Sequence, residues 1–160
     1  PRIHRHRESA SAEPKRGPGR GTRGPVIYLD TSALVKLIVQ EAESADLRRW
    51  LADADDRDHV TSAVGRVELM RTALRSGDPE IVADARRMLD EDLDILTVTD
   101  EVIETAETIG PESLRSLDAI HLASAAQLTD ALTAIVVYDH RLIEGCRDLD
   151  YPIESPGAAR

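Results

Sequence analysis

Aromatic residues are scarce in this chain of 160 residues, which contains no Phe, one Trp and three Tyr. A hydrophobic core must therefore be built from Leu, Ile, Val and Ala, and an aliphatic core of this kind is typical of helices packed on a parallel sheet. The length favours a single domain whose core is large enough to fold unaided.

Cysteine and long apolar runs are also lacking. The single cysteine, Cys146, excludes an intrachain disulfide and a zinc site built from several cysteines, and we interpret it as a partly buried small hydrophobic residue. No apolar run approaches the roughly 18 residues that a membrane span needs, and the N-terminus has no signal-like apolar region. These absences predict a soluble, cytoplasmic protein with no membrane partner.

Basic residues are few beyond residue 25. Residues 1–25 carry seven Arg or Lys and two Glu, a net charge of +5, whereas the rest of the chain carries 13 basic and 28 acidic residues, a net charge of −15. This acidity argues against a passive nucleic-acid binder, because affinity for a phosphate backbone comes mainly from Lys and Arg. It does not exclude an enzyme that contacts phosphate through bound metal ions. Most of the acidity is typical of a solubilising surface.

Composition divides the chain into three parts. Residues 1–25 are rich in Arg, Gly, Pro and Ser without apolar periodicity, which predicts a disordered basic arm, or a tag, since the chain does not begin with Met. Residues 26–156 are predicted to form the folded domain, and residues 157–160 form a tail.

Short apolar strands alternate with helical segments along the domain. Strands are predicted at residues 26–29, 59–61, 95–98, 134–138 and, weakly, 151–153. Helices are predicted at residues 32–40, 44–54, 62–76, 78–92 and 99–109, and from residues 116 and 141. This alternation implies right-handed crossovers and an α/β fold of three layers, with a mostly parallel sheet of four to five strands covered on both faces.

Two helices are expected to bury an apolar side. In the helix over residues 62–76 that side consists of Val64, Val67, Met70 and Leu74. In the helix from residue 116 it consists of Leu117, Ile120, Ala123 and Ala126.

Carboxylates occupy unusual positions in this pattern. Asp30, Asp100 and Asp139 each follow a predicted strand, whereas Glu68 and Asp118 lie within helices among apolar residues. An isolated buried carboxylate is costly, so each of these must be paired, hydrogen-bonded or bound to a metal ion.

For single acids, structural explanations compete with functional ones. Asp30 is placed equally well to cap the following helix and to take part in chemistry beyond the end of a strand. Glu68 could pair with Arg71 or Arg75 on its own helix, and the helix dipole favours Asp118 in a first turn.

Taken together, the acids favour a metal site. Parallel topology brings the ends of the first and fourth strands, and the helix start at Asp118, to the same edge of the sheet. Carboxylates there would repel one another by roughly 4 kcal/mol per close pair at an effective dielectric near 20, which a cation would relieve. Oxygen ligands without His or Cys select Mg²⁺ or Mn²⁺. One or two such ions can activate a water molecule and stabilise the oxyanion that leaves a phosphodiester.

Four segments carry a resemblance to a known family. They are residues 30–36 (Asp-Thr-Ser-Ala-Leu-Val-Lys), 66–68 (Arg-Val-Glu), 116–125 (Ser-Leu-Asp-Ala-Ile-His-Leu-Ala-Ser-Ala) and 137–142 (Val-Tyr-Asp-His-Arg-Leu). In this order they resemble the four acidic motifs of PIN-domain ribonucleases, specifically the VapC toxins of bacterial toxin–antitoxin pairs. The likeness spans residues 26 to about 156.

The resemblance assigns roles to individual residues. It implies that the catalytic, Mg²⁺-binding acids are Asp30, Glu68, Asp118 and Asp139. Ser32 would hydrogen-bond within the site, and Glu41 resembles a further acid near the cleft. Thr31 and Ser32 would then cap the first helix in place of Asp30. Asp100 matches no motif and is interpreted as a helix cap.

The family likeness implies a metal-dependent endoribonuclease, using Mg²⁺ or a substitute Mn²⁺, that cleaves structured RNA such as tRNA or ribosomal RNA and halts translation. It also implies a homodimer silenced by a VapB antitoxin, in a heterotetramer or larger complex. Candidate contacts to RNA phosphates are Lys36, Arg66, Arg71, Arg141 and Arg147.

Two alternatives remain open. One is a PIN-like domain that binds its antitoxin without cleaving RNA. The other is a phosphatase with an aspartyl nucleophile, although that chemistry generally requires a second Asp two residues after the first, where this chain has Ser32.

Overall fold

A five-stranded parallel sheet forms the centre of the protein. The computed structural model describes residues 24–54 and 56–159, and the predicted arm lies outside these residues except for its last two. The strands are β1 (Val26–Leu29), β2 (Asp58–Ser62), β3 (Asp94–Leu96), β4 (Leu132–Val136) and β5 (Ile153–Glu154), in the order β3-β2-β1-β4-β5. Every neighbouring pair is parallel, which confirms the predicted fold class.

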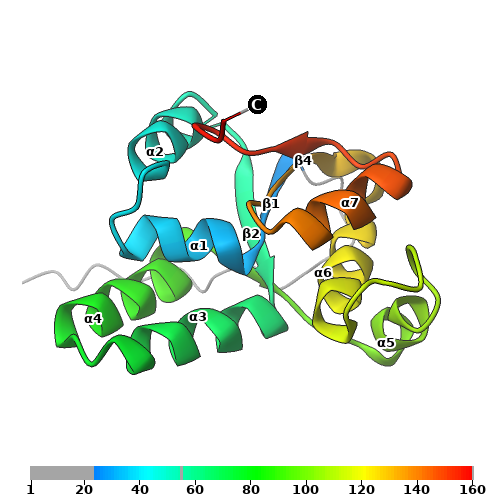
Figure 1. The fold of residues 1–160 in the computed structure, drawn as a ribbon, viewed down its shortest axis with the longest axis horizontal. Coiled ribbons are helices and arrows are strands. Elements are labelled where there is room, and N and C mark those ends of the chain that lie inside the picture. Colours follow the sequence, from blue (N-terminus) through cyan, green and yellow to red (C-terminus); the bar gives the residue numbers. More distant parts are fainter. Residues whose placement is uncertain (1–23, 55, 160) are drawn as a thin grey trace, which may run out of the picture.

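Alternating residues of the central strand β1 divide the core into two halves. Ile27 and Leu29 belong to a cluster with helices α1 (Thr31–Ile38), α2 (Ser44–Ala52), α3 (Ala63–Ser76) and α4 (Pro79–Arg87). Val26 and Tyr28 belong to a second cluster with α6 (Ser116–Ala126) and α7 (His140–Asp148). The helices thus form one layer on each side of the sheet (Figure 1), as the sequence predicted.

Helix starts follow the predicted capping residues in most cases. The Ser62 hydroxyl accepts a hydrogen bond from the Gly65 amide at the start of α3, and Asp78 caps α4 with Pro79 in its first turn. The predicted helix end near residue 92 is a short π-helical turn, η1 (Met88–Asp92). Helix α5 (Asp100–Ala106) is capped by the Thr99 side chain, so the cap assigned to Asp100 was wrong.

Strand limits differ from the prediction by up to two residues. The β4 ladder occupies residues 132–136 instead of 134–138 because the chain pairs with β1 from Leu132 onward. Val137 continues the apolar run and is fully buried, and its amide donates to the Glu154 carbonyl beyond the regular ladder. Hydrophobicity alone therefore predicted which residues are buried, but it did not predict where the strand ends.

The predicted buried side of α3 was wrong for Val67 and Leu74, whereas Met70 is partly buried and packs against the first core cluster. Val67 and Leu74 are 59% and 54% exposed, whereas Gly65, Leu69 and Ala73 are the buried residues of this helix. The two small residues allow α3 to approach its neighbours closely, so the side of the helix with less apolar volume faces the core. This arrangement leaves two large apolar side chains of α3 at the surface.

The start of helix α6 also differs from the predicted pattern of burial. Leu117 is 48% exposed, whereas the six buried residues of the helix are Ala119, His121, Leu122, Ala123, Ser124 and Ala125. On α7, Cys146 is fully buried, more deeply than predicted. No helix in the described part of the chain is both long and apolar enough to cross a membrane.

Candidate functional site

Asp30 stands at the carboxyl end of β1 and at the N-cap of α1. Its Oδ2 atom accepts hydrogen bonds from the Ser32 amide (2.9 Å) and the Ser32 hydroxyl (2.6 Å), and the Tyr138 amide donates to that hydroxyl oxygen (2.8 Å). The residue is only 5% exposed. Asp30 therefore caps the helix itself, which corrects the expectation that Thr31 and Ser32 would replace it. Its second oxygen remains on the side of the other acids.

Asp139 has an equivalent position just beyond β4. Its side chain caps α7 and accepts hydrogen bonds from the amides of Arg141 (2.9 Å) and Leu142 (3.2 Å). Because β1 and β4 are parallel neighbours, the caps of α1 and α7 lie at the same edge of the sheet. Asp139 is exposed there, whereas Asp30 is buried.

Glu68 turns from α3 toward this edge. Its Oε2 atom accepts a hydrogen bond from the Thr31 hydroxyl and lies 2.9 Å from Nε2 of His121. The hydrogen bond with His121 holds the pKa of Glu68 below its usual value, although partial burial opposes this shift and Thr31 reinforces it. Glu68 thus pairs with Thr31 and His121, and not with Arg71 or Arg75, which the sequence offered as a structural alternative.

Asp118 lies in the first turn of α6. Its Oδ2 atom is buried and has no hydrogen-bond partner among the described residues. Burial raises the pKa of Asp118, the charges of Asp139 and Asp30 raise it further, and Arg115 opposes the shift. The charges of Asp30 and Asp139 therefore repel that of Asp118, as expected for carboxylates gathered at one edge.

His121 joins these acids, and sequence reasoning assigned it no role. The imidazole is 2% exposed, with Nδ1 at 2.7 Å from the Tyr28 hydroxyl and Nε2 at 3.7 Å from Oδ1 of Asp30. Burial would lower the pKa of His121, but the hydrogen bond with Glu68 and the charges of nearby carboxylates outweigh burial and raise it. One signal was present in the sequence: His121 follows Asp118 by three residues, which places both on one face of the helix.

Asp30 and Glu68 lie next to the buried imidazole, Asp118 acts on it through its charge, and Asp139 acts on Asp118 through its charge. Within residues 24–54 and 56–159, no group of three or more His, Cys, Asp and Glu side chains is arranged to hold a metal ion. The donor set nevertheless suits a hard cation, because it offers carboxylate oxygens, mutual repulsion and the unpartnered Oδ2 of Asp118.

Glu41 belongs to a different cluster. Its carboxylate pairs with Nζ of Lys36 at 2.6 Å, Glu43 pairs with the same nitrogen at 2.7 Å, and the cation lies 4.7 Å from the centre of the Tyr138 ring. Burial would lower the pKa of Lys36, but the hydrogen bonds that its ammonium group donates to both glutamates raise it. The buried amine is therefore occupied, which removes Lys36 from the candidate RNA contacts.

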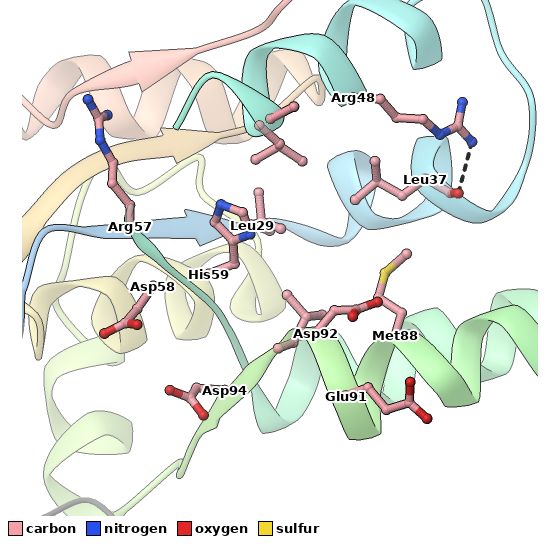
Figure 2. A pocket seen from close by; sticks show the side chains of 13 residues that line it. Leu29, Leu37, Arg48, Arg57, Asp58, His59, Met88, Glu91, Asp92 and Asp94 are labelled. Carbon is pink, nitrogen blue, oxygen red and sulfur yellow. Dashed lines mark hydrogen bonds between the residues drawn. The ribbon is translucent and has the colours of Figure 1, made fainter. Parts of the chain in front are cut away.

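A cavity of about 760 Å³ opens elsewhere, between α2, β2 and η1 (Figure 2). Its apolar lining includes Leu29, Leu37, Leu51, Met88 and Leu93. Arg48 borders the cavity and donates a hydrogen bond to the Leu37 carbonyl (3.0 Å), as Figure 2 shows. None of the four predicted acids lines this space, so the cavity is distinct from the candidate site.

Comparisons with known proteins agree with the geometry. Residues 27–146 match the family model of the PIN domain. Ribonuclease VapC47 of Mycobacterium tuberculosis is 55% identical over 84% of this chain and all of its own length, and Ribonuclease VapC35 of the same species is 44% identical over the same shares. The crystal structure of VapBC2 from Rickettsia felis, bound to a DNA fragment from its promoter, matches 81% of this chain and 97% of the compared chain with a TM-score of 0.64. At 15% identity, that last likeness shows the fold alone.

Proposed function

Because the chain belongs to the VapC family of PIN-domain proteins, we propose that it is a Mg²⁺-dependent endoribonuclease and the toxin of a toxin–antitoxin pair. Its substrate would be a structured RNA such as tRNA or ribosomal RNA, whose cleavage inhibits translation. The observation that carries the proposal is the buried Oδ2 atom of Asp118, which has no hydrogen-bond partner among the described residues and lies on a carboxylate that Asp30 and Asp139 repel. The names of the relatives, which are ribonucleases, support the reaction class.

The acids that would hold the ion are Asp30, Glu68, Asp118 and Asp139. Mg²⁺, or Mn²⁺ in its place, would supply an activated water molecule and charge stabilisation for the leaving oxyanion. The chain itself contributes fixed carboxylates. Ser32 locks one oxygen of Asp30, and Thr31 locks one oxygen of Glu68.

Exposed cationic side chains would contact RNA phosphates. Arg115 acts on Asp118 through its charge and is exposed, although the sequence analysis did not single it out. Arg71, Arg141 and Arg147 are exposed as well, and the exposed Arg66 is paired with Asp90 at 3.7 Å. An exposed ion pair is weak, so Arg66 remains available to phosphate.

The proposed protein partner is a VapB-type antitoxin. The structural neighbour from Rickettsia felis is a VapBC complex, and the acidic composition of the domain suits a basic antitoxin segment. Complementary charge of this kind mainly accelerates association.

A second copy of the chain is the other proposed partner. Val67 and Leu74 on α3 are more than half exposed, and covering them in a homodimer would remove apolar surface from water. Light scattering of the purified protein tests this directly: Leu74→Asp should shift a dimer toward monomer, whereas Ile103→Asp on α5 serves as the matched control.

RNA cleavage by antitoxin-free protein tests the activity. Wild type should cut total RNA at discrete sites with Mg²⁺, and Asp30→Asn should not. Asn caps helices as well as Asp does, so this variant removes the charge while keeping the cap. Equal cleavage by both proteins would indicate a contaminating nuclease and refute the proposal. Failure of the folded wild type to cut any RNA would favour an antitoxin-binding domain without activity.

A further inference from the structure

His121 uses both ring nitrogens to connect three elements of the fold. Nδ1 faces the Tyr28 hydroxyl on β1 at 2.7 Å, and Nε2 faces Oε2 of Glu68 on α3 at 2.9 Å, while the ring itself belongs to α6. The ring is 2% exposed, so water does not compete for either contact. Two hydrogen bonds in opposite directions fix the plane of the imidazole.

The contact with His121 fixes one carboxylate oxygen of Glu68 and leaves the other oxygen without a hydrogen bond among the described residues. Both His121 and Thr31 bind Oε2, and Oε1 has no hydrogen-bond partner within the described residues. The Glu68 side chain is 30% exposed, so a ligand can reach it. A carboxylate held by one oxygen presents the second in a defined direction.

The start of α3 is shaped around the same ring. A methyl group on Gly65, three residues before Glu68, would overlap Oγ1 of Thr61 and lie 3.3 Å from Cε1 of His121. The absence of a side chain at Gly65 thus allows the first turn of α3 to sit against the imidazole. This packing is independent of the hydrogen bonds and places Glu68 within reach of Nε2.

We propose that His121 is a positioning residue, whose Nε2–H group orients the Glu68 carboxylate for binding a divalent cation. Tyr28 supports the ring from the opposite side. The inference deepens the proposed function, because it explains how one of the four acids acquires its geometry. Groups that orient metal ligands typically change metal affinity by about 10- to 100-fold when they are removed.

Two substitutions separate positioning from simple packing. In His121→Gln the side-chain amide nitrogen replaces Nε2 and keeps the donor to Glu68, whereas in His121→Asn the amide replaces Nδ1 and keeps the contact with Tyr28. Each variant loses one of the two hydrogen bonds and some ring volume, so both should lose thermal stability. A structural role alone predicts similar behaviour of the two variants.

Mn²⁺ binding, measured by the loss of the paramagnetic resonance signal of free Mn²⁺, provides a readout independent of RNA cleavage. The Gln variant should bind within about threefold of wild type, and the Asn variant should bind about 10-fold or more weakly. Leu47→Val, a core change in α2, is the control for lost stability and should leave Mn²⁺ affinity unchanged.

The outcomes distinguish this inference from the proposed function. Equal affinities of the Gln and Asn variants, or an Asn variant as tight as wild type, would overturn the role of His121 while leaving the metal site intact. A wild-type protein that binds no Mn²⁺ would overturn both. Wild type that binds Mn²⁺ with the expected difference between variants, yet cuts no RNA, would overturn the nuclease proposal alone.

Discussion

Replacing Asp118 with Asn is expected to have opposite effects on stability without and with Mg²⁺. In the absence of metal, the carboxylate of wild type is repelled by Asp30 and Asp139 and is partly buried, which is why its pKa is raised. A close pair of charges at 4 Å costs about 4 kcal/mol at an effective dielectric of 20 and about 1 kcal/mol in water. Because Asp118 is partly exposed, we expect screened values, about 1 to 2 kcal/mol for both neighbours together.

The substitution also removes a favourable interaction. A negative charge in the first turn of a helix contributes about 0.3 to 1 kcal/mol, so the net stabilisation of the Asn variant in EDTA should be about 1 kcal/mol. For a domain of this size, that corresponds to a rise in Tm of about 3 °C. Saturating Mg²⁺ should reverse the order, because an ion at 100 times its Kd stabilises wild type by about 2.7 kcal/mol and should not stabilise the variant.

The pH dependence gives an independent check. A carboxyl group with a raised pKa holds its proton more tightly in the folded state, so its penalty is absent below the unfolded value near 3.8 and develops as pH rises through the folded value. The advantage of the Asn variant in EDTA should therefore vanish below pH 3.8 and grow as the pH rises through the raised pKa of Asp118. Thermal melts of both proteins in EDTA and in Mg²⁺ at several pH values measure this difference in stability. A variant less stable than wild type in EDTA, or equal Mg²⁺ responses, would refute the reasoning.

Three other substitutions test the packing around the site. In urea titrations of the monomeric Leu74→Asp variant, Leu69→Ala should lower the free energy of unfolding by about 2 to 5 kcal/mol, whereas Val67→Ala on the exposed side of α3 should change it by less than about 0.5 kcal/mol; similar losses would contradict the observed helix face. Ser32→Ala should cost about 1 to 3 kcal/mol by leaving the Tyr138 amide unpaired, and an unchanged midpoint would exclude that bond as a stabiliser. Lys36→Met should lower Tm at pH 7, and the loss should shrink as the pH falls below 4.5 through the lowered pKa of Glu43, because protonation of Glu43 removes its ion pair with Lys36 in the wild type. A loss independent of pH would contradict this.

The architecture was predictable because it depends on local patterns. Apolar β-branched runs and the capping residues Ser62 and Asp78 each act within a few positions of the chain, so the alternation of strands and helices and the helix starts could be inferred from the sequence. The buried face of α3 could not be predicted in this way. Apolar residues occur on two sides of that helix, and small size at Gly65 and Ala73, rather than hydrophobicity, decides which side approaches the core.

The partners within the site were less predictable because they are distant in sequence. Thr31 and His121 bind Glu68 across 37 and 53 positions, so a local search for its partner favoured the arginines of its own helix instead. For Asp30, the difficulty was to choose between two roles. The sequence presented capping and chemistry as alternatives, but a carboxylate has two oxygens, and Oδ2 caps α1 while Oδ1 lies 3.7 Å from the imidazole.

The buried polar groups at this edge are themselves an argument for function. Tyr28, Ser62 and His121 lie in the interior where aliphatic residues would pack without hydrogen-bond requirements, and each is at most 2% exposed. A buried polar network is costly wherever a member is unsatisfied, and Asp118 retains such an atom at the edge of this one. Natural sequences depart from the most stable choice mainly at functional sites. The network from Tyr28 through His121 to Glu68 is such a departure, since buried polar side chains there hold a partly exposed carboxylate in place.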